Sequence, residues 1–276
     1  MRRLVVGFVT LALWLAIAPG ASALGWAVQQ TPNPAGGMSS KPDGVSCASL
    51  SSCTAVGFST NRTGAAATLA ERWKGTSWSI QRTPNPAGAT SSSLLGVSCA
   101  SPRSCTAVGF WYYISLPSSE VMLAERWNAS SWSVQRTPNP AGATYGQFAG
   151  VSCPSLRFCT AVGFFTDRAG TLSALAERWN RNSWSIQRTP NPIDGALVGV
   201  SCPSTTACTA LASNAAATLA ERWNGTSWMI QPTPNPADAI SSQLDGVSCA
   251  SPRSCAAVGT FTNLAGTNMT LAERYS

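Results

Sequence analysis

Short runs that alternate apolar and polar residues cover most of the chain after residue 24, and turn-forming residues separate them. Four such runs recur in the same order, with the sequences GVSC, CTAVGF, TLAERW and WSIQRTP or close variants. Alternation of this kind is typical of β-strands with one buried face. The pattern therefore predicts an all-β protein made of repeated groups of four short strands.

The groups of four runs return with a period of roughly 50 residues, which is typical of propeller blades. The first run begins at Gly44, Gly96, Gly150, Gly199 and Gly246. The third run ends at Trp73, Trp127, Trp179, Trp223 and Tyr275. We therefore expect a five-bladed β-propeller of four-stranded antiparallel blades, or a ring with more blades if the sequence is a fragment.

The loops and the chain ends support this arrangement. Residues 74–77 and 224–227 join the third and fourth runs, and an Asn-Gly such as that at Asn224 is a strong hairpin signal. Trp73 and Trp78 flank the first of these loops and should form a cross-strand pair. The repeat region opens with a lone fourth run, residues 26–31, and closes with a lone third run, residues 271–275. We expect the N-terminal strand to close the last blade, because ring closure removes unpaired edges.

The N-terminus has the pattern of a secretory signal peptide. A basic start precedes an apolar run over residues 4–17, and Ala21-Ser22-Ala23 supplies a small-residue cleavage site. We expect residues 1–23 to be cleaved and residues 24–276 to form one propeller domain. The alternative is an uncleaved N-terminal anchor, although the apolar run is short for a membrane span. No later stretch reaches spanning length, so we expect a secreted, extracellular or cell-surface protein with no span after cleavage.

Ten cysteines form five pairs, each with the two cysteines six positions apart. In an exported chain such pairs predict disulfides, one per blade, which staple the first strand to the second within each blade. Zinc sites use shorter spacings and often histidine, so we expect no metal and no cofactor. The predicted pairs are Cys47/Cys53, Cys99/Cys105, Cys153/Cys159, Cys202/Cys208 and Cys249/Cys255.

The charge and the absence of histidine argue against some classes of function. Only 11% of the residues are charged, the net charge is +7, and two of the basic residues leave with the signal peptide. The other arginines are spread along the chain, so we expect no nucleic acid partner. The absence of histidine removes the commonest acid–base group. We expect a monomer.

Acidic residues supply the weak catalytic candidates. A glutamate recurs in every third run, at Glu71, Glu125, Glu177, Glu221 and Glu273. The third strand of a blade lies far from the ring axis, so we expect these glutamates to be structural. Three of them are followed by an arginine on the same predicted face, as Glu71 is by Arg82, but the pattern fails in the other two copies. Asp43 and Asp245 precede the first strand of the first and last copies, where they would form a carboxylate pair for glycoside hydrolysis, a calcium site, or two solvated turn residues.

The connections that vary between copies join the second run to the third and the fourth run to the next copy. Both kinds lie on one face of the predicted propeller, where repeat proteins commonly bind ligands. Aromatic residues gather in two of these connections, which should be adjacent. They are Trp111, Tyr112 and Tyr113 in one and Tyr145 and Phe148 in the other. With flanking polar residues they indicate a carbohydrate or peptide site, or else local packing over a strand end.

The hairpin at residues 223–228, WNGTSW, is similar to the repeat hairpins of kelch-type and Asp-box (sialidase-type) propellers. The whole mature chain thereby resembles the repeat-type β-propellers of secreted bacterial proteins. This hairpin keeps the Gly-Thr and Trp of an Asp-box and lacks its Asp. Neither the arginine triad nor the Tyr–Glu pair that sialidases need falls on matching positions. The resemblance therefore implies a fold and does not imply catalysis.

Three hypotheses follow from these observations. The first is a non-enzymatic binding or scaffold module that holds a glycan or protein ligand on the variable face. The second is a glycoside hydrolase or lyase that uses Asp43 and Asp245 at the channel mouth. The third is a structural surface protein without a small ligand.

Overall fold

The computed structural model describes residues 25–113, 116–190, 195–213 and 218–276. The chain divides into two units, Met1–Gln30 and Thr31–Ser276, and every described strand belongs to the second. Within the described residues, no helix is long and apolar enough to cross a membrane. The expected signal peptide, residues 1–23, lies outside the described residues, so its cleavage stays a prediction.

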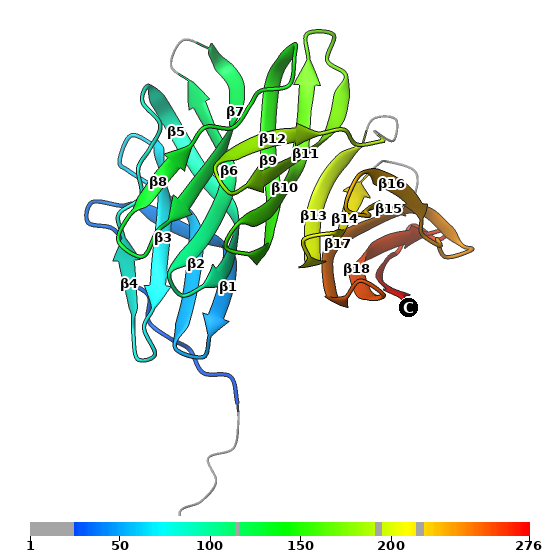
Figure 1. Cartoon of the computed structure of the whole chain (residues 1–276), viewed down its shortest axis with the longest axis horizontal. Helices are drawn as coiled ribbons and strands as arrows, with labels where there is room; N and C mark the ends of the chain where they lie inside the picture. Colours follow the sequence, from blue (N-terminus) through cyan, green and yellow to red (C-terminus); the bar gives the residue numbers. More distant parts are fainter. Residues whose placement is uncertain (1–24, 114–115, 191–194, 214–217) are drawn as a thin grey trace, which may run out of the picture. The chain divides into compact units, whose positions relative to one another are not determined.

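The second unit consists of five antiparallel sheets that follow one another along the chain (Figure 1). In each sheet the strands pair in chain order, so every sheet is a simple meander. The first sheet contains β1 (Ser39–Ser49), β2 (Ser52–Thr60), β3 (Ala66–Trp73) and β4 (Trp78–Gln81). The second contains β5 (Ala89–Ser101), β6 (Ser104–Tyr113), β7 (Leu116–Trp127) and β8 (Trp132–Gln135). The third contains β9 (Ala143–Ser155), β10 (Phe158–Asp167), β11 (Leu172–Asn180) and β12 (Ser183–Gln187). The fourth contains β13 (Ala196–Ser204), β14 (Ala207–Ser213), β15 (Thr218–Trp223) and β16 (Trp228–Pro232), and the fifth contains β17 (Ala239–Ser251), β18 (Ser254–Asn263) and β19 (Asn268–Tyr275).

The predicted register within the sheets is confirmed. Trp73 pairs with Trp78 across the third and fourth strands of the first sheet, and Glu71 pairs with Ile80. The two tryptophan rings are 5.8 Å apart, and equivalent pairs occur in the next three sheets. Gly75 and Gly225 have positive φ values of 88° and 102°, which the tight turn between these strands requires.

All five predicted disulfides are present, one in each sheet. Each joins the first strand to the second, and the Cα atoms of the two cysteines are 3.9 to 4.0 Å apart. Each bridge closes a loop of only seven residues, for which the chain-entropy estimate is about 2 kcal/mol. The bridges therefore hold the innermost hairpin of every sheet.

The bridges join the first two strands of each sheet as predicted, and the second cysteine of three of them is also part of the core between sheets. Cys105, Cys159 and Cys208 are buried, with only 2 to 3% of their surface exposed, and each belongs to an apolar cluster shared with the preceding sheet. Their sulfur atoms lie 3.4 to 3.7 Å from the hydroxyl of a threonine on that sheet, at Thr54, Thr106 and Thr160. A buried disulfide behaves as an apolar group, so these three cysteines are packing residues and offer no surface to a ligand.

The rest of the apolar core also lies between neighbouring sheets. In one cluster Val56 and Ala70 of the first sheet pack against Leu94, Ala107 and Trp132 of the second. The innermost strands contact one another in order, β1 with β5, β5 with β9, β9 with β13 and β13 with β17.

The recurrent glycine of the first run permits this close packing of neighbouring sheets. A Cβ atom on Gly96 would lie only 3.3 Å from the Cα of Gly150 on the next innermost strand. A larger residue at this position would therefore force the two strands apart.

The last sheet differs from the expectation. Residues 25–34 form no strand, so β17, β18 and β19 make a three-stranded sheet without the predicted closing strand, residues 26–31. In the other sheets a short hairpin turn links the fourth strand to the third and sets the register. Residues 26–31 precede the first sheet, so no hairpin turn can link them to β19, and pairing between chain ends carries a loop-closure cost.

Candidate functional site

The best-defined candidate site lies where β6, β7 and β9 meet, among the variable connections. Tyr112 near the end of β6 pairs with Glu120 near the start of β7. The hydroxyl of Tyr112 donates a hydrogen bond to Oε1 of Glu120. Tyr145 of the third sheet also forms a hydrogen bond to Glu120. The structure thus brings together two of the predicted aromatic residues, one from each of the two variable connections, around one carboxylate.

The aromatic rings around Glu120 are themselves held in place. Tyr145 stacks on Phe164 with 5.9 Å between ring centroids and 24° between planes. Phe110 packs edge-on against Tyr112 at 5.6 Å. Edge-on and offset-stacked contacts are the favoured arrangements of aromatic pairs. Both tyrosines therefore approach Glu120 from fixed directions.

Glu120 is buried, with 6% of its surface exposed, and its Oε2 has no hydrogen-bond partner among the described residues. The hydrogen bond to Glu120, together with burial, raises the pKa of Tyr112 to about 12. Burial and then the hydrogen bond to Glu120 raise the pKa of Tyr145 as well. Both phenols therefore remain protonated donors near neutral pH. An acceptor like Oε2, buried without a protein donor in the described chain, is unusual, because buried acceptors are normally satisfied.

Beside this carboxylate lies a cavity of about 440 Å³. Its polar lining comes from Glu120, Asn139, Thr144, Tyr145 and Arg168. A Cβ atom on Gly146, which also lines the cavity, would lie 2.5 Å from Sδ of Met122. A side chain at residue 146 would therefore require the Met122 side chain to move. The volume falls within the usual range of small-ligand sites, about 300 to 1,000 Å³.

The other predicted aromatic residues lie elsewhere. Trp111 and Tyr113 alternate with Tyr112 along β6, so they lie on its opposite face, with their rings 5.5 Å apart. Trp111 packs against the core between the first and second sheets, whereas Tyr113 is 38% exposed. Phe148 is fully buried and stacks on Trp184. The expectation that Phe148 binds a ligand is therefore corrected, because the residue belongs to the core.

The two candidate catalytic aspartates each have a local partner. Nζ of Lys41 lies 2.6 Å from Oδ1 of Asp43, and Asp245 accepts a hydrogen bond of 3.1 Å from Nε2 of Gln243. A cavity of about 310 Å³ beside the first sheet is lined by Asp43 and Glu71 and not by Asp245. Among the described residues, no group of three acidic, histidine or cysteine side chains is placed to hold a metal ion.

The repeated glutamates lie in the interfaces between sheets. Glu125, Glu177 and Glu221 are fully buried, and no ion pair joins a repeated glutamate to an arginine in the described chain. Burial raises the pKa of Glu125 and Glu177 to about 8, with a hydrogen bond from Thr68 opposing the effect on Glu125. These two carboxyl groups therefore stay mostly protonated and neutral at pH 7, which lowers the free-energy cost of burying them.

Sequence reasoning missed Glu120 and Arg168. Glu120 is the only acidic residue of the second copy outside its third run, and it follows the aromatic cluster by seven residues. Hairpin pairing of β6 with β7 would have placed it opposite Tyr112. The signal was therefore present, but locating it required the register of a long hairpin.

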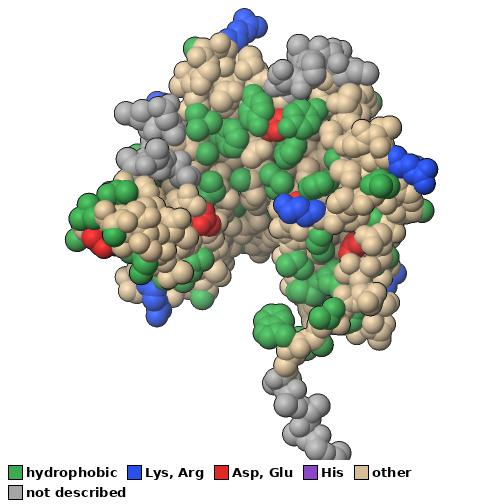
Figure 2. Space-filling model, turned by 180° about the vertical axis from the view of Figure 1, so that it is seen from behind, with side chains coloured by type: hydrophobic (Ala, Val, Ile, Leu, Met, Phe, Trp, Pro, Cys, Tyr) green, Lys and Arg blue, Asp and Glu red, His purple; other side chains and the backbone are tan. Residues whose placement is uncertain are grey.

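Figure 2 shows one face of the molecule, with apolar side chains gathered over the sheets and the Lys and Arg side chains lying in scattered positions. On this face the basic side chains are not gathered in one patch. This view agrees with the even spread of arginines along the sequence.

Comparison with known proteins defines the fold. No protein-family model and no curated protein matches the chain. Among solved structures, a Hadza microbial sialidase has a TM-score of 0.54 and 8% identity over 83% of this chain. A protein of unknown function from Dyadobacter fermentans has a TM-score of 0.58 and 8% identity, covering 84% of this chain and 74% of its own. The chain spans 55% of the length of the sialidase chain.

These likenesses, together with five meander sheets in sequence, identify the protein as an all-β, propeller-type repeat protein with about one disulfide per blade. At 8% identity the likeness concerns the fold alone. The kelch-type and Asp-box features of the blades stay predictions.

Proposed function

We propose that this protein is a secreted or extracellular carbohydrate-binding propeller, whose site is the cavity beside Glu120. The observation that carries the proposal is a buried carboxylate at the wall of a ligand-sized cavity, with an Oε2 that has no donor in the described part of the chain. A carboxylate oxygen accepts hydrogen bonds from neighbouring sugar hydroxyls, and a tyrosine ring offers an apolar surface to the sugar face. The five disulfides support export, because such bonds persist in oxidising compartments.

The other lining groups fit the same ligand class. Arg168 and Asn139 present donors, and Thr144 can donate or accept. One neighbour in fold is a sialidase, which makes carbohydrates the first ligand class to test. A protein ligand on the same face is the alternative occupant. The glycoside hydrolase hypothesis is less well supported, since Asp43 and Asp245 each have their own local partner.

Binding of a glycan array, followed by calorimetric titration of the best ligand, tests the proposal. Glu120→Gln should weaken binding at least about tenfold, because it removes a charged acceptor from the site. Tyr145→Ala should weaken it further by removing a wall of the cavity. Tyr113→Ala is the matched control, since Tyr113 lies on the other face of β6 and should leave affinity unchanged.

Two results would count against the proposal. Equal affinity of wild type and Glu120→Gln would place the ligand elsewhere. Release of new reducing ends from the bound glycan would show an enzyme, and retention of that activity in the Asp43→Asn, Asp245→Asn double variant would exclude those two residues as its catalysts.

A further inference from the structure

The turns that join the first strand to the second, and the third to the fourth, have charged residues of one sign only. Because every sheet is an antiparallel meander, both kinds of turn lie at the same end of the sheet. The turns contain no acidic residue, and their five basic residues are all exposed. These residues are Lys74, Arg103, Arg157, Arg181 and Arg253. We call this end of the sheets the turn face.

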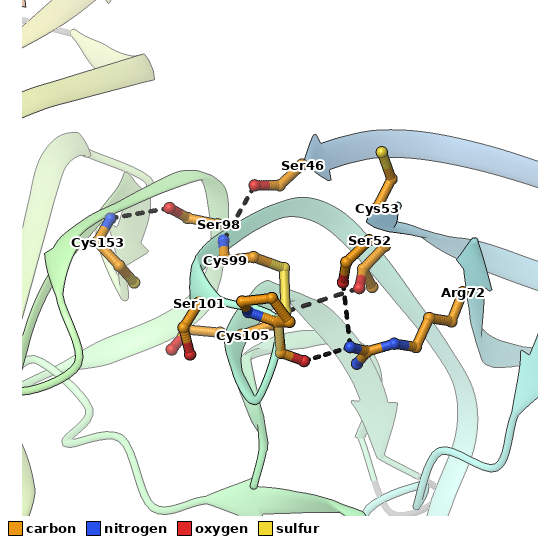
Figure 3. The surroundings of a disulfide bond; sticks show 12 residues. Ser46, Ser52, Cys53, Arg72, Ser98, Cys99, Ser101, Cys105 and Cys153 are labelled. Atoms are coloured by element: carbon orange, nitrogen blue, oxygen red, sulfur yellow. Dashed lines mark hydrogen bonds between the residues drawn. A yellow bond between two sulfur atoms is a disulfide. The ribbon is translucent and has the colours of Figure 1, made fainter. Parts of the chain in front are cut away.

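Hydrogen bonds between neighbouring sheets place their turns side by side. Arg72, labelled in Figure 3, donates from the end of β3 to the backbone carbonyl of Pro102, in the turn after β5. Arginines at the equivalent positions of the next three sheets make the same contact. They are Arg126 with the carbonyl of Leu156, Arg178 with that of Thr205 and Arg222 with that of Pro252. The turns of all five sheets therefore lie on one face of the molecule.

In three of these turns a second arginine directly follows the residue whose carbonyl accepts. The resulting pairs are Arg72 with Arg103, Arg126 with Arg157 and Arg222 with Arg253. In each pair the backbone N–H of the second arginine donates to a serine hydroxyl two residues earlier, at 3.2 to 3.4 Å. This shared hydrogen bond gives the three turns equivalent backbones. Each turn thus presents two guanidinium groups that come from neighbouring sheets.

Among the described residues, no carboxylate forms an ion pair with these arginines. The one side-chain ion pair there joins Lys41 to Asp43, in the first sheet and away from its turns. The repeated glutamates lie close to the turns in sequence, but burial raises the pKa of Glu125 and Glu177 to about 8, so both are mostly neutral at pH 7. Asp167 lies at the other end of its sheet, where β10 ends. The turn face therefore has a positive potential at neutral pH.

We propose that the turn face binds an anionic polysaccharide, whose successive charged groups occupy the arginine pairs of neighbouring sheets. A guanidinium donates two parallel hydrogen bonds to a carboxylate or phosphate group, and a sulfate offers similar oxygens. The pairs in the turns of the second and third sheets are adjacent, so one extended chain can engage both. Two linked contacts bind more tightly than either contact alone. The cavity beside Glu120 lies at the opposite end of the strands, so the turn face is a second site.

Two other anionic partners fit this face less well. Proteins that bind single-stranded nucleic acids offer aromatic rings on which bases stack. Here guanidinium groups cover such rings, as Arg126 lies 4.4 Å from the ring centroid of Trp179. Proteins that lie on a membrane bury an apolar face in it. The large exposed apolar residues of the turns are Leu50 and Leu156, in two different sheets, which is little apolar surface to insert.

Titration calorimetry of the full chain with heparin, a sulfated polysaccharide, tests the proposal. Heparin should bind at an ionic strength of about 0.15 M, and desulfated heparin should bind far more weakly. Arg103→Gln with Arg157→Gln should weaken heparin binding about tenfold or more, because each substitution removes a charged donor. Arg136→Gln with Arg188→Gln is the matched control. These exposed arginines belong to the same two sheets, follow β8 and β12 at the opposite end, and should leave the affinity unchanged.

Four outcomes would overturn the proposal. The first is heparin affinity that is unchanged in the Arg103→Gln, Arg157→Gln variant. The second is an equal loss in the two double variants, which would show a response to net charge alone. The third and fourth are tighter binding to single-stranded DNA, or to vesicles that contain phosphatidylserine, than to heparin. Glu120→Gln should leave heparin binding unchanged, so this proposal and the cavity site fail or stand separately.

Discussion

At the scale of single residues, the least expected feature is the acid buried in each interface between sheets. Glu177 is fully buried, and neither carboxyl oxygen has a hydrogen-bond partner among the described residues. An ionised carboxylate in such a place would be very costly. Burial raises its pKa to about 8, so the folded protein holds this residue mainly as a neutral acid at pH 7. The recurrent glutamate is thus a packing residue whose protonation state depends on the fold.

The pH dependence of stability follows from this pKa. The folded state keeps the acidic hydrogen up to about pH 8, while the unfolded chain loses it above the ordinary value of 4.5. The stabilisation by the protonated Glu177 is therefore fully present below pH 4.5. It decreases as the pH rises above 4.5 and is gone once the pH has passed about 8. Glu177→Gln should remove this pH-dependent loss, which is about 5 kcal/mol for a shift from 4.5 to about 8, since the amide cannot ionise.

Urea unfolding at a series of pH values measures the effect. Glu177→Gln should be more stable than wild type at pH 9 and close to it at pH 4. Asp238→Asn is the control, because Asp238 is exposed and should not alter the difference between these two pH values. Parallel pH profiles for wild type and Glu177→Gln would show that the buried acid does not titrate as described.

At the scale of the element, the hairpins between third and fourth strands show how local sequence specifies structure. The turn of the first copy has a glycine at the position of positive φ, and so does that of the fourth copy. The second copy has Ala129 there, with φ of 79°. An alanine in this region is strained by its Cβ atom, at a cost of roughly 1 kcal/mol.

Ala129→Gly should therefore stabilise the protein by about 1 kcal/mol, and the matched change Gly225→Ala should destabilise it by at least as much. At residue 225 the added Cβ would also lie 3.3 Å from Cβ of Thr206. Thermal unfolding by calorimetry gives both values. A loss of stability in Ala129→Gly would mean that the unfolded state, or a contact of the alanine methyl, outweighs the relief of strain.

Strands, register and disulfide pairing were predictable from sequence because each depends on neighbouring residues of one repeat. Trp73 opposite Trp78 and Cys47 bonded to Cys53 follow from hairpin pairing alone. The closing strand at residues 26–31 was not predictable in the same way, since its pairing depends on the two ends of the repeat.

Burial between sheets was harder to predict than pairing within them. Phe148 lies beside an aromatic connection, which indicated exposure, but it is buried in the apolar cluster between the second and third sheets, where it stacks on Trp184. The burial of Cys105 shows the same limit, because its sulfur packs against Thr54 of the preceding sheet. Cys-x5-Cys spacing specifies the bonded partner and carries no information about which neighbouring sheet covers it.

The candidate site was predictable from the sequence only in part. The variable face and two of its aromatic residues, Tyr112 and Tyr145, were predicted as candidates from differences between copies. Glu120 was not, because its role arises only when β7 pairs with β6 and β9 packs beside them. A site formed across two sheets combines a local register with a non-local contact, and the second is not encoded in any single repeat.

At the scale of the whole molecule, sheets contact mainly the sheets before and after them, so stability is close to a sum of terms for each sheet and each interface. In four pairs of neighbouring sheets, an arginine of one sheet lies over an aromatic ring of the next and donates to a backbone carbonyl there, and these arginine contacts make up part of the interface term. Guanidinium stacking on an aromatic ring, with a hydrogen bond to a carbonyl, contributes about 1 to 3 kcal/mol at a partly buried interface. Loss of one such arginine contact should therefore weaken the coupling between the two sheets that it joins.

Arg126→Ala tests this coupling at the interface between the second and third sheets. The arginine lies 4.4 Å from the ring centroid of Trp179 and donates to the carbonyl of Leu156 at 3.2 Å. Its removal should lower the free energy of unfolding by about 2 kcal/mol and broaden or split the thermal transition, because the sheets on either side can then unfold separately. Arg136→Ala, an exposed arginine after the same sheet, should leave the transition sharp. A single sharp transition in Arg126→Ala, with a midpoint equal to that of Arg136→Ala, would contradict this prediction. Apolar packing alone would then couple the sheets, and the arginine contact would add nothing to their stability.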